Sequence, residues 1–250
     1  MFDLSSKAAI VTGGGAGLGR AYALALAEAG ASVVVADVNT SVADEVVGEI
    51  EAAGGRAVAA RVDVSQRQDT EKMAQTCLDS FGRIDVLVTN AGVSDPAMIH
   101  KMTEEQWDRV ISVNQKGVFH SIQAVLPTMR EQESGRIINV ASASGLIGDI
   151  GQINYAASKG AVIAMTKAAA RELARYKITV NALSPVARTE MTRTVFEDPQ
   201  FKDLYLSFIP LGYFGEPEEI SPAVVFLASD EAAYVTGVIF RVDGGRAIGT

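Results

Sequence analysis

The sequence has few of the residues that build disulfide or metal scaffolds. Cys77 is the one cysteine among 250 residues, so the chain cannot close an internal disulfide and offers no thiolate cluster for zinc. We interpret it as a small apolar side chain on a helix. His100 and His120 have no partners at metal-ligand spacing, so we predict no metal site.

Positive charge and long apolar runs are also scarce. Lys and Arg number 22 against 30 for Asp and Glu, a formal net charge of -8 with no basic stretch, which argues against nucleic acid as the main partner. No run approaches the roughly 18 apolar residues of a membrane span. The N-terminus lacks the pattern of a signal peptide. We therefore expect no membrane partner and a cytoplasmic location.

What the sequence contains is an alternation of short apolar runs and longer helical patterns. The runs predicted as strands are residues 8–12, 31–37, 57–62, 84–89, 136–141, 178–183 and 238–242. The helical patterns lie at 17–29, 41–53, 65–81 and 154–176, and another helix begins at Thr103 in the capping-box sequence T-E-E-Q. Strands that are apolar throughout favour a parallel sheet covered on both faces. We predict one α/β domain over residues 1–250, a doubly wound Rossmann-type parallel sheet of about seven strands.

One segment lacks this regularity. Residues 190–215 contain several aromatic side chains and no clear strand or helix pattern. A long segment of this kind in a compact domain is usually functional, so we expect it to act as a substrate lid.

A glycine-rich segment, T-G-G-G-A-G-L-G at residues 12–19, connects the first strand to the first helix. Glycines there let the backbone approach a pyrophosphate, whose charge the helix N-terminus favours. The motif alone is weak evidence, but its place between a strand and a helix strengthens it. The segment predicts a dinucleotide site.

The second strand ends in Asp37, whose carboxylate can accept hydrogen bonds from an adenosine ribose. A 2′-phosphate would meet this negative charge, and Gly14, Gly15 and Val38 supply no cation to offset it. We therefore expect NAD, with NADP disfavoured. The alternative for Asp37 is a loop carboxylate without a ligand.

A second group of polar residues falls at strand ends and on the helix that follows the fifth strand. Tyr155 and Lys159 stand four residues apart in Q-I-N-Y-A-A-S-K-G, so they share one helix face. That spacing is common in helices that merely face solvent. The segments T-N-A-G at 89–92 and A-S-A-S-G at 141–145 add weight, because ligands of open parallel sheets sit beyond the carboxyl ends of the strands.

These motifs together resemble the short-chain dehydrogenase/reductase family. The resemblance rests on T-G-x-x-x-G-x-G, the N-A-G after the fourth strand, Asn114, Ser142, Y-x-x-x-K at 155–159 and V-D-G-G at 242–245. It covers essentially the whole chain, in order. It implies an NAD-dependent oxidoreductase that transfers a hydride between the cofactor and a secondary alcohol or ketone.

The resemblance also implies four catalytic residues. Ser142 would hydrogen-bond the substrate oxygen, and Tyr155 would transfer the proton. Lys159 would lower the pKa of the tyrosine and bind the nicotinamide ribose, while Asn114 would hold a water that links the lysine to solvent. A base useful near pH 7 needs the tyrosine pKa of about 10 to fall by about three units. Ser144 is the alternative to Ser142, and a buried structural amide is the alternative for Asn114.

The residues expected to bind the cofactor lie on the glycine segment, at strand ends and on the helix with the tyrosine. Asp63 would contact the adenine, Asn90 the adenosine side and Thr189 the nicotinamide carboxamide. The whole set is Thr12, Gly13, Gly17, Leu18, Gly19, Asp37, Asp63, Val64, Asn90, Ala91, Gly92, Tyr155, Lys159, Pro185, Val186 and Thr189. The family usually has glycine after this proline, and we expect Val186 to narrow the pocket.

The expected pocket is lined by apolar side chains, which suggest a fairly apolar secondary alcohol or ketone. The candidates are Val186, Met191, Phe196, Phe208, Tyr213 and Phe214, with Leu146, Ile147 and Gln152. The alternative for each aromatic side chain is that it packs the lid onto the body of the domain and does not touch substrate. Arg188 and Arg193 lie close enough that binding of a substrate carboxylate by an arginine stays an alternative.

Two other functions stay open. The helices are also similar to those of 3-oxoacyl thioester reductases (acyl carrier protein or coenzyme A), which usually take NADP, whereas Asp37 argues against NADP. A third possibility is a nucleotide-sensing protein without turnover. The family resemblance further implies a homotetramer, for which Ala157, Ala161, Ala164 and Ala168 would allow close helix approach.

Overall fold

A computed structural model describes residues 2–193, 197 and 199–249, and in it the strands form one parallel sheet. The strands are β1 (Ala8–Thr12), β2 (Ser32–Asp37), β3 (Arg56–Arg61), β4 (Val86–Thr89), β5 (Gly135–Val140), β6 (Ile178–Pro185) and β7 (Ile239–Val242). Their order across the sheet is β3-β2-β1-β4-β5-β6-β7. The predicted seven-stranded, doubly wound sheet is confirmed.

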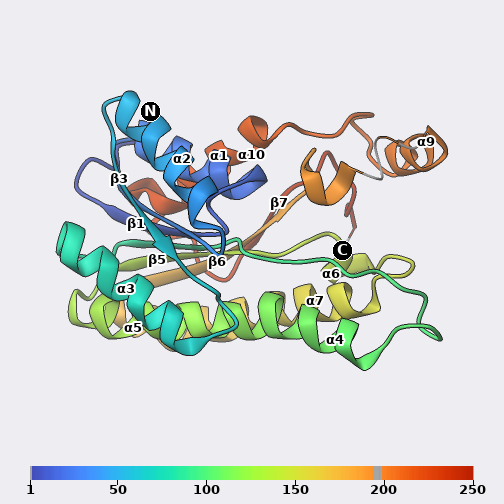
Figure 1. The fold of residues 1–250 in the computed structure, drawn as a ribbon, viewed down its shortest axis with the longest axis horizontal. Coiled ribbons are helices and arrows are strands. Elements are labelled where there is room, and N and C mark those ends of the chain that lie inside the picture. Colours follow the sequence, from blue (N-terminus) through green and yellow to red (C-terminus); the bar gives the residue numbers. More distant parts are fainter. Residues whose placement is uncertain (1, 194–196, 198, 250) are drawn as a thin grey trace.

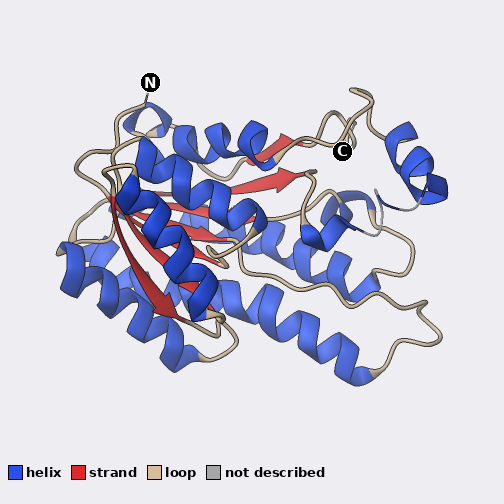
Figure 2. Cartoon of the chain, turned by 45° about the horizontal axis from the view of Figure 1, so that its top comes forward, coloured by secondary structure: helices blue, strands red, loops and turns tan. Residues whose placement is uncertain are grey.

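Helices cover both faces of this sheet (Figures 1 and 2). The helices are α1 (Gly17–Glu28), α2 (Thr40–Ala52), α3 (Arg67–Phe81), α4 (Glu104–Ile111), α5 (Gly117–Glu131), α6 (Ser144–Ile147), α7 (Ile153–Leu173), α9 (Pro199–Ser207) and α10 (Pro217–Ala228). A π-helical turn, η1 (Ser112–Lys116), joins α4 to α5. The short 3-10 turns are η2 (Ala174–Tyr176), η3 (Glu190–Thr192) and η4 (Asp230–Ala232). Helices α1, α2 and α10 lie on one face, and α3, α5 and α7 lie on the other.

Two apolar clusters explain why the strands are apolar throughout. Along β2, Val33 and Val35 belong to the cluster beneath α1, α2 and α10, whereas Val34 and Ala36 belong to the cluster beneath α3, α5 and α7. Successive strand residues point to opposite faces, so a sheet covered on both faces needs apolar residues at every position. This packing aligns all carboxyl ends of the strands at one edge.

The segment at 190–215 differs from the irregular lid expected from the sequence. It contains the turn η3 and the helix α9, which begins at Pro199, a residue whose fixed φ suits the first position of a helix. In Figure 1 α9 lies apart from the sheet, at the side where the strands β6 and β7 end. The role of the segment as a lid stays a prediction.

Within the described ranges no helix combines the length and the apolar character needed to cross a bilayer.

Candidate active site

The glycine segment between β1 and α1 is packed so closely that side chains are excluded from it. Gly13 and Gly17 have positive φ values of 62° and 52°. A Cβ atom added to Gly19 would come within 1.9 Å of the Gly13 carbonyl oxygen. The Asn90 amide, at the end of β4, donates to the carbonyl oxygens of Thr12 and Gly13 at 3.1 and 3.0 Å. Asn90 therefore holds the loop in place, a role that the sequence did not reveal.

The start of α1 fits the pyrophosphate of a dinucleotide. Its N-cap residue is Ala16, whose side chain has no acceptor for the first amides of the helix. Those amides, together with the positive end of the helix dipole, form an anion site. A Cβ atom on Gly17 would lie 3.6 Å from Cγ2 of Thr189, so the segment after β6 reaches this loop. The expected cofactor residues of the loop and Thr189 thus lie together.

Asp37 is committed to hydrogen bonds within the protein. Its carboxylate accepts from the backbone amides of Gly15 and Asn39, both at 3.0 Å. In the neighbouring strand Arg61 lies in register with it and is exposed. Side chains of residues in register on adjacent strands point to the same face of the sheet. Arg61 therefore brings a positive charge to the same face of the sheet as Asp37, a relation that depends on strand register.

Asp63 and Val64, the residues expected near the adenine, follow β3. The Asp63 carboxylate accepts from the amide and the hydroxyl of Ser65 at 2.9 and 2.7 Å. Val64 is buried, and a Cβ atom on Gly117 would come within 2.6 Å of its side chain. Contacts of these residues with a cofactor stay predictions.

Helix α7 brings Tyr155 and Lys159 to the carboxyl end of β5. The Lys159 ammonium is buried, donates to the Val140 carbonyl oxygen at 2.7 Å and lies 5.7 Å from the centre of the Tyr155 ring. Burial raises the pKa of Tyr155 to about 12, opposed by a hydrogen bond with Ser142. Burial also lowers the pKa of Lys159 to about 8. In the protein alone Tyr155 is thus a phenol at neutral pH, in contrast to the lowered tyrosine pKa expected from the sequence.

The two candidate serines have different partners. Ser142 interacts with Tyr155 and accepts from the Ser144 amide at 3.2 Å. The Ser144 hydroxyl instead donates to Asp149. The geometry favours Ser142 as the residue that meets a substrate oxygen.

Asn114 is fully buried inside the π-helical turn η1, a distortion often found at functional sites. Its amide oxygen accepts from the Val93 amide at 2.8 Å, and its nitrogen donates to the Val93 carbonyl oxygen at 2.9 Å and to the Ser158 hydroxyl at 3.2 Å. Asn114 therefore joins the segment after β4 to α7. The role of Asn114 in holding a water molecule stays a prediction.

The expected pocket residues range from buried to half exposed, with Val186, Leu146 and Gln152 partly buried. Phe214 is buried and stacks on Tyr205 of α9, with ring centres 6.2 Å apart. Met191, Phe208 and Tyr213 are about half exposed. Phe196 lies outside the described residues.

Neither arginine proposed as a carboxylate clamp is directed to that task. Arg188 forms an ion pair with Glu216, and Arg193 forms ion pairs with Glu190 and Glu197. The backbone at Val186, the residue expected to narrow the pocket, is held by its amide, which donates to the Val242 carbonyl oxygen at 3.0 Å.

Three residues of the site were missed by the sequence analysis: Asp149, Tyr205 and Arg246. Asp149 and Tyr205 both act on Tyr155 electrostatically and raise its pKa. Arg246 reaches Asp149 from beyond the V-D-G-G motif, with 2.5 Å between Nη2 and Oδ1. The motif itself was the available signal, because its two glycines turn the chain back with φ values of 61° and 91°.

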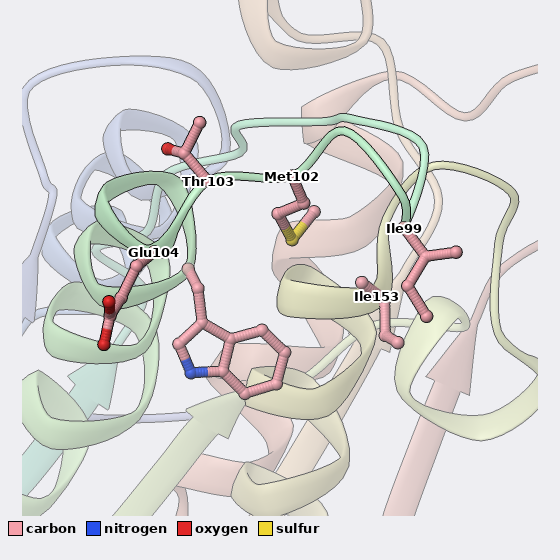
Figure 3. A pocket seen from close by; sticks show the side chains of 6 residues that line it. Ile99, Met102, Thr103, Glu104 and Ile153 are labelled. Carbon is pink, nitrogen blue, oxygen red and sulfur yellow. The ribbon is translucent and has the colours of Figure 1, made fainter.

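A separate hollow of about 320 Å³ lies near the start of α7 (Figure 3). Its lining is mostly apolar and comprises Ile99, Met102, Thr103, Glu104, Trp107 and Ile153. Ile153 precedes Tyr155 by two residues, which at about 100° per residue places the two side chains on opposite sides of the helix. The hollow is therefore not the space in front of Tyr155.

Comparisons with known proteins match the chain over nearly its whole length. A family model described as enoyl-(acyl carrier protein) reductase matches residues 13–247. The 3-oxoacyl-[acyl-carrier-protein] reductase FabG of Thermotoga maritima is 44% identical over 98% of this chain and 99% of its own length. The 3-oxoacyl-[acyl-carrier-protein] reductase of Synechocystis sp. is 45% identical over 99% of this chain and 100% of its own length. The crystal structure of gox2181 superposes with a TM-score of 0.96, at 36% identity over 98% of this chain and 97% of that one.

These relatives correct the expected cofactor. The expectation of NAD is wrong, because 3-oxoacyl-acyl-carrier-protein reductases, the class to which the relatives belong by name, depend on NADPH. The physical reason lies in the geometry at the end of β2. The Asp37 carboxylate accepts hydrogen bonds from two backbone amides, and Arg61, in register with it on β3, brings to the same face of the sheet a positive charge that Gly14, Gly15 and Val38 lack. The comparisons also favour the 3-oxoacyl alternative over the apolar alcohol as substrate.

Proposed function

Because the chain belongs to the short-chain dehydrogenase/reductase family and is an oxidoreductase of CH–OH and C=O groups, we propose that it reduces the ketone of 3-oxoacyl thioesters with NADPH. The family predicted from the sequence is confirmed. The substrate class follows the names of the relatives at 44% and 45% identity. Reduction uses Tyr155 as a phenol that gives up its proton, and the raised pKa of Tyr155 favours this protonated form.

NADPH lies along the carboxyl edge of the sheet in this proposal. The glycine segment and the first amides of α1 hold its pyrophosphate, and Asp63, Asn90 and Thr189 are placed along its length. Arg61 offsets the charge of Asp37 near the adenosine ribose. When bound, the cofactor supplies the hydride that reduces the ketone carbon.

The residues of the chain then orient the ketone and deliver the proton. Ser142 donates a hydrogen bond to the ketone oxygen, and Tyr155 gives its phenolic proton to that oxygen as negative charge develops there. Lys159 stabilises the phenolate that remains, because its buried ammonium lies next to the ring. Asn114 would hold a water molecule in the path along which a proton returns from solvent to the active site.

The experiment follows NADPH oxidation with acetoacetyl-coenzyme A as the substrate. Tyr155→Phe is expected to lower kcat by roughly 10²- to 10⁴-fold, the usual contribution of a positioned general acid, while NADPH still binds. Tyr176→Phe is the matched control, because Tyr176 stacks with Arg130 and Arg175 at the far end of α7, and it should retain wild-type kcat. Turnover of simple secondary alcohols without any turnover of the thioester would overturn the proposal.

The homotetramer, the cytoplasmic location and the lid at 190–215 also stay proposals. Ala157, Ala164 and Ala168 of α7 are exposed in the single chain and Ala161 is half-buried, which supports a helix interface between copies.

A further inference from the structure

The chain carries a buried arginine that the proposed mechanism does not use. The side chain of Arg246 is 4% exposed and that of Asp149 is 15% exposed, and the two form an ion pair. The Arg246 guanidinium also lies over the ring of Tyr205, 4.2 Å from its centre. Arginine is rarely buried unless its charge and its N–H groups have partners, since removing the charge from water is costly.

A rigid turn, residues 243–247, holds this side chain. The buried carboxylate of Asp243 accepts from the amides of Gly245 and Ala247 at 2.9 and 3.0 Å. The Arg246 amide donates to the Asp243 carbonyl oxygen at 3.1 Å, and the Gly244 carbonyl oxygen accepts from Leu211 at 3.1 Å. The turn is thereby fixed against the segment that follows α9. Arg246 is placed by the fold and is not part of a loose tail.

A chain of contacts links Arg246 to the reacting groups. Asp149, its ion-pair partner, accepts from the Ser144 hydroxyl, and the Ser144 hydroxyl lies 3.4 Å from that of Ser142. Ser142 in turn interacts with Tyr155. Tyr205 provides a second link, because it contacts the guanidinium and acts on Tyr155. Arg246 is therefore connected through Asp149 and Ser144 to Ser142, the serine assigned to the ketone oxygen.

One nitrogen of the Arg246 guanidinium is left over. Nη2 serves Asp149, whereas Nη1 is buried and has no hydrogen-bond partner among the residues that the structure describes. A buried donor without a partner is unfavourable, so an acceptor brought by a substrate would satisfy it. The charge of the guanidinium is already balanced by Asp149. A neutral oxygen therefore suits the position better than a carboxylate, which would compete with Asp149 and add a second buried negative charge.

We propose that Nη1 of Arg246 donates a hydrogen bond to a second carbonyl oxygen of the substrate, two carbons from the ketone that is reduced. In a 3-oxoacyl thioester this is the thioester carbonyl, so the proposal rests on the proposed function and refines it. Arg246 then selects 1,3-dicarbonyl compounds over plain ketones. The Asp149 pair and the Tyr205 ring keep the guanidinium oriented.

The test compares pentane-2,4-dione with pentan-2-one, which differ only in the second carbonyl group, and adds acetoacetyl-coenzyme A as the thioester. The wild-type enzyme should prefer the dione in kcat/KM. Arg246→Met, which keeps length but has no donor, should lower kcat/KM for the dione and the thioester by roughly 10- to 100-fold, the range for losing a hydrogen bond from a charged group. Because Arg246→Met also removes the ion-pair partner of Asp149, kcat/KM for pentan-2-one should fall as well but by less, so the ratio of kcat/KM for the dione to that for pentan-2-one should drop by roughly tenfold or more.

The controls separate recognition from folding. Arg67→Met removes an exposed arginine paired with Glu71 on α3 and should leave all three substrates unchanged. If Arg246→Met does not fold, Arg246→Lys retains a cation for Asp149, lacks the second nitrogen of the guanidinium fork, and should show the same selective loss. An equal loss for the dione and for pentan-2-one, no loss, or no preference in the wild type would overturn the assignment. Absent thioester turnover with an intact dione preference would reject the proposed function alone.

Discussion

At the scale of single residues, Tyr155 and Lys159 have pKa values displaced in opposite directions by the same cause. Burial disfavours the charged form of each, so it raises the pKa of the phenol to about 12 and lowers that of the ammonium to about 8. Below a pH of about 8 the pair consists of a neutral acid and a cation. This is the protonation state that ketone reduction requires.

We therefore predict that ketone reduction falls as the pH rises through about 8. The lysine pKa is lowered, so the ammonium loses its charge well before a free lysine would, and the phenolate formed in the reaction loses its stabilisation. The tyrosine stays protonated over this interval because its own pKa is raised. The measurement is kcat/KM against pH, which reports ionisations of the free enzyme.

Lys159→Arg provides the comparison for this pH profile. An arginine stays charged throughout, so the variant should be slower but should lack the decline near a pH of about 8. A wild-type profile that stays level into the alkaline range would show that the charge of Lys159 is not needed.

The catalytic pair could be predicted from the sequence, whereas part of its surroundings could not. Tyr155 and Lys159 are four residues apart on one helix, so local periodicity alone places them together. Arg246 and Asp149 are separated by 97 positions and meet only after the turn at 243–247 has folded against the segment after α9. Similarly, Arg61 lies beside Asp37 through strand register, which no local pattern in the sequence displays.

At the scale of elements, the junction of β1 and α1 depends on the absence of a side chain at Gly19. A Cβ atom there would come within 1.9 Å of the Gly13 oxygen and 2.5 Å of the Asn90 amide nitrogen, far inside van der Waals contact. The clash is with backbone, which cannot rotate away. The loop can therefore accept a larger residue only by leaving the position that it holds at the end of the sheet.

Gly19→Ala is accordingly predicted to raise the Kd for NADPH at least about tenfold and to lower the free energy of unfolding by about 1–3 kcal/mol, the usual range for overpacking. Gly48→Ala is the matched control on α2, where an added Cβ meets nothing within 4 Å in the described structure. Alanine there should stabilise the helix by about 0.5–1 kcal/mol. Fluorescence titration and urea unfolding measure the two quantities, and wild-type NADPH affinity in Gly19→Ala would refute the role of the loop.

Helices and strands with a clear local sequence signal could be predicted nearly as they occur. Elements that depend on tertiary contacts could not be predicted. The capping box at Thr103 is present, with the Thr103 and Gln106 side chains bonded reciprocally. The π-helical turn around Asn114 was not foreseen, because it follows from the hydrogen bonds of the Asn114 amide with Val93 and Ser158. Helix α9 was also missed, since its sequence has no clear apolar stripe and it packs through Tyr205 on Phe214.

At the scale of the whole molecule, cofactor binding and folding are coupled. The segments predicted to hold NADPH follow β1, β2, β3, β4 and β6, which belong to one sheet shared by both apolar clusters. The cofactor can bind only when this sheet is intact, so it stabilises the native state by mass action. A global melting temperature therefore reports which cofactor fits the edge.

NADPH at about 100 times its Kd is predicted to add about 2.7 kcal/mol of stability. For a chain of this size each kcal/mol is worth about 2–4 °C, so Tm should rise by about 5–11 °C in a thermal scan. Arg61→Ala should reduce the rise with NADPH and leave the smaller rise with NADH unchanged, because only NADPH carries the 2′-phosphate. Arg56→Ala, at the opposite end of β3, where Arg56 lies over the ring of Phe81, should retain both shifts. A larger rise with NADH than with NADPH at equal concentration would mean that the charge of Asp37 outweighs that of Arg61, and the assignment of NADPH would then fail.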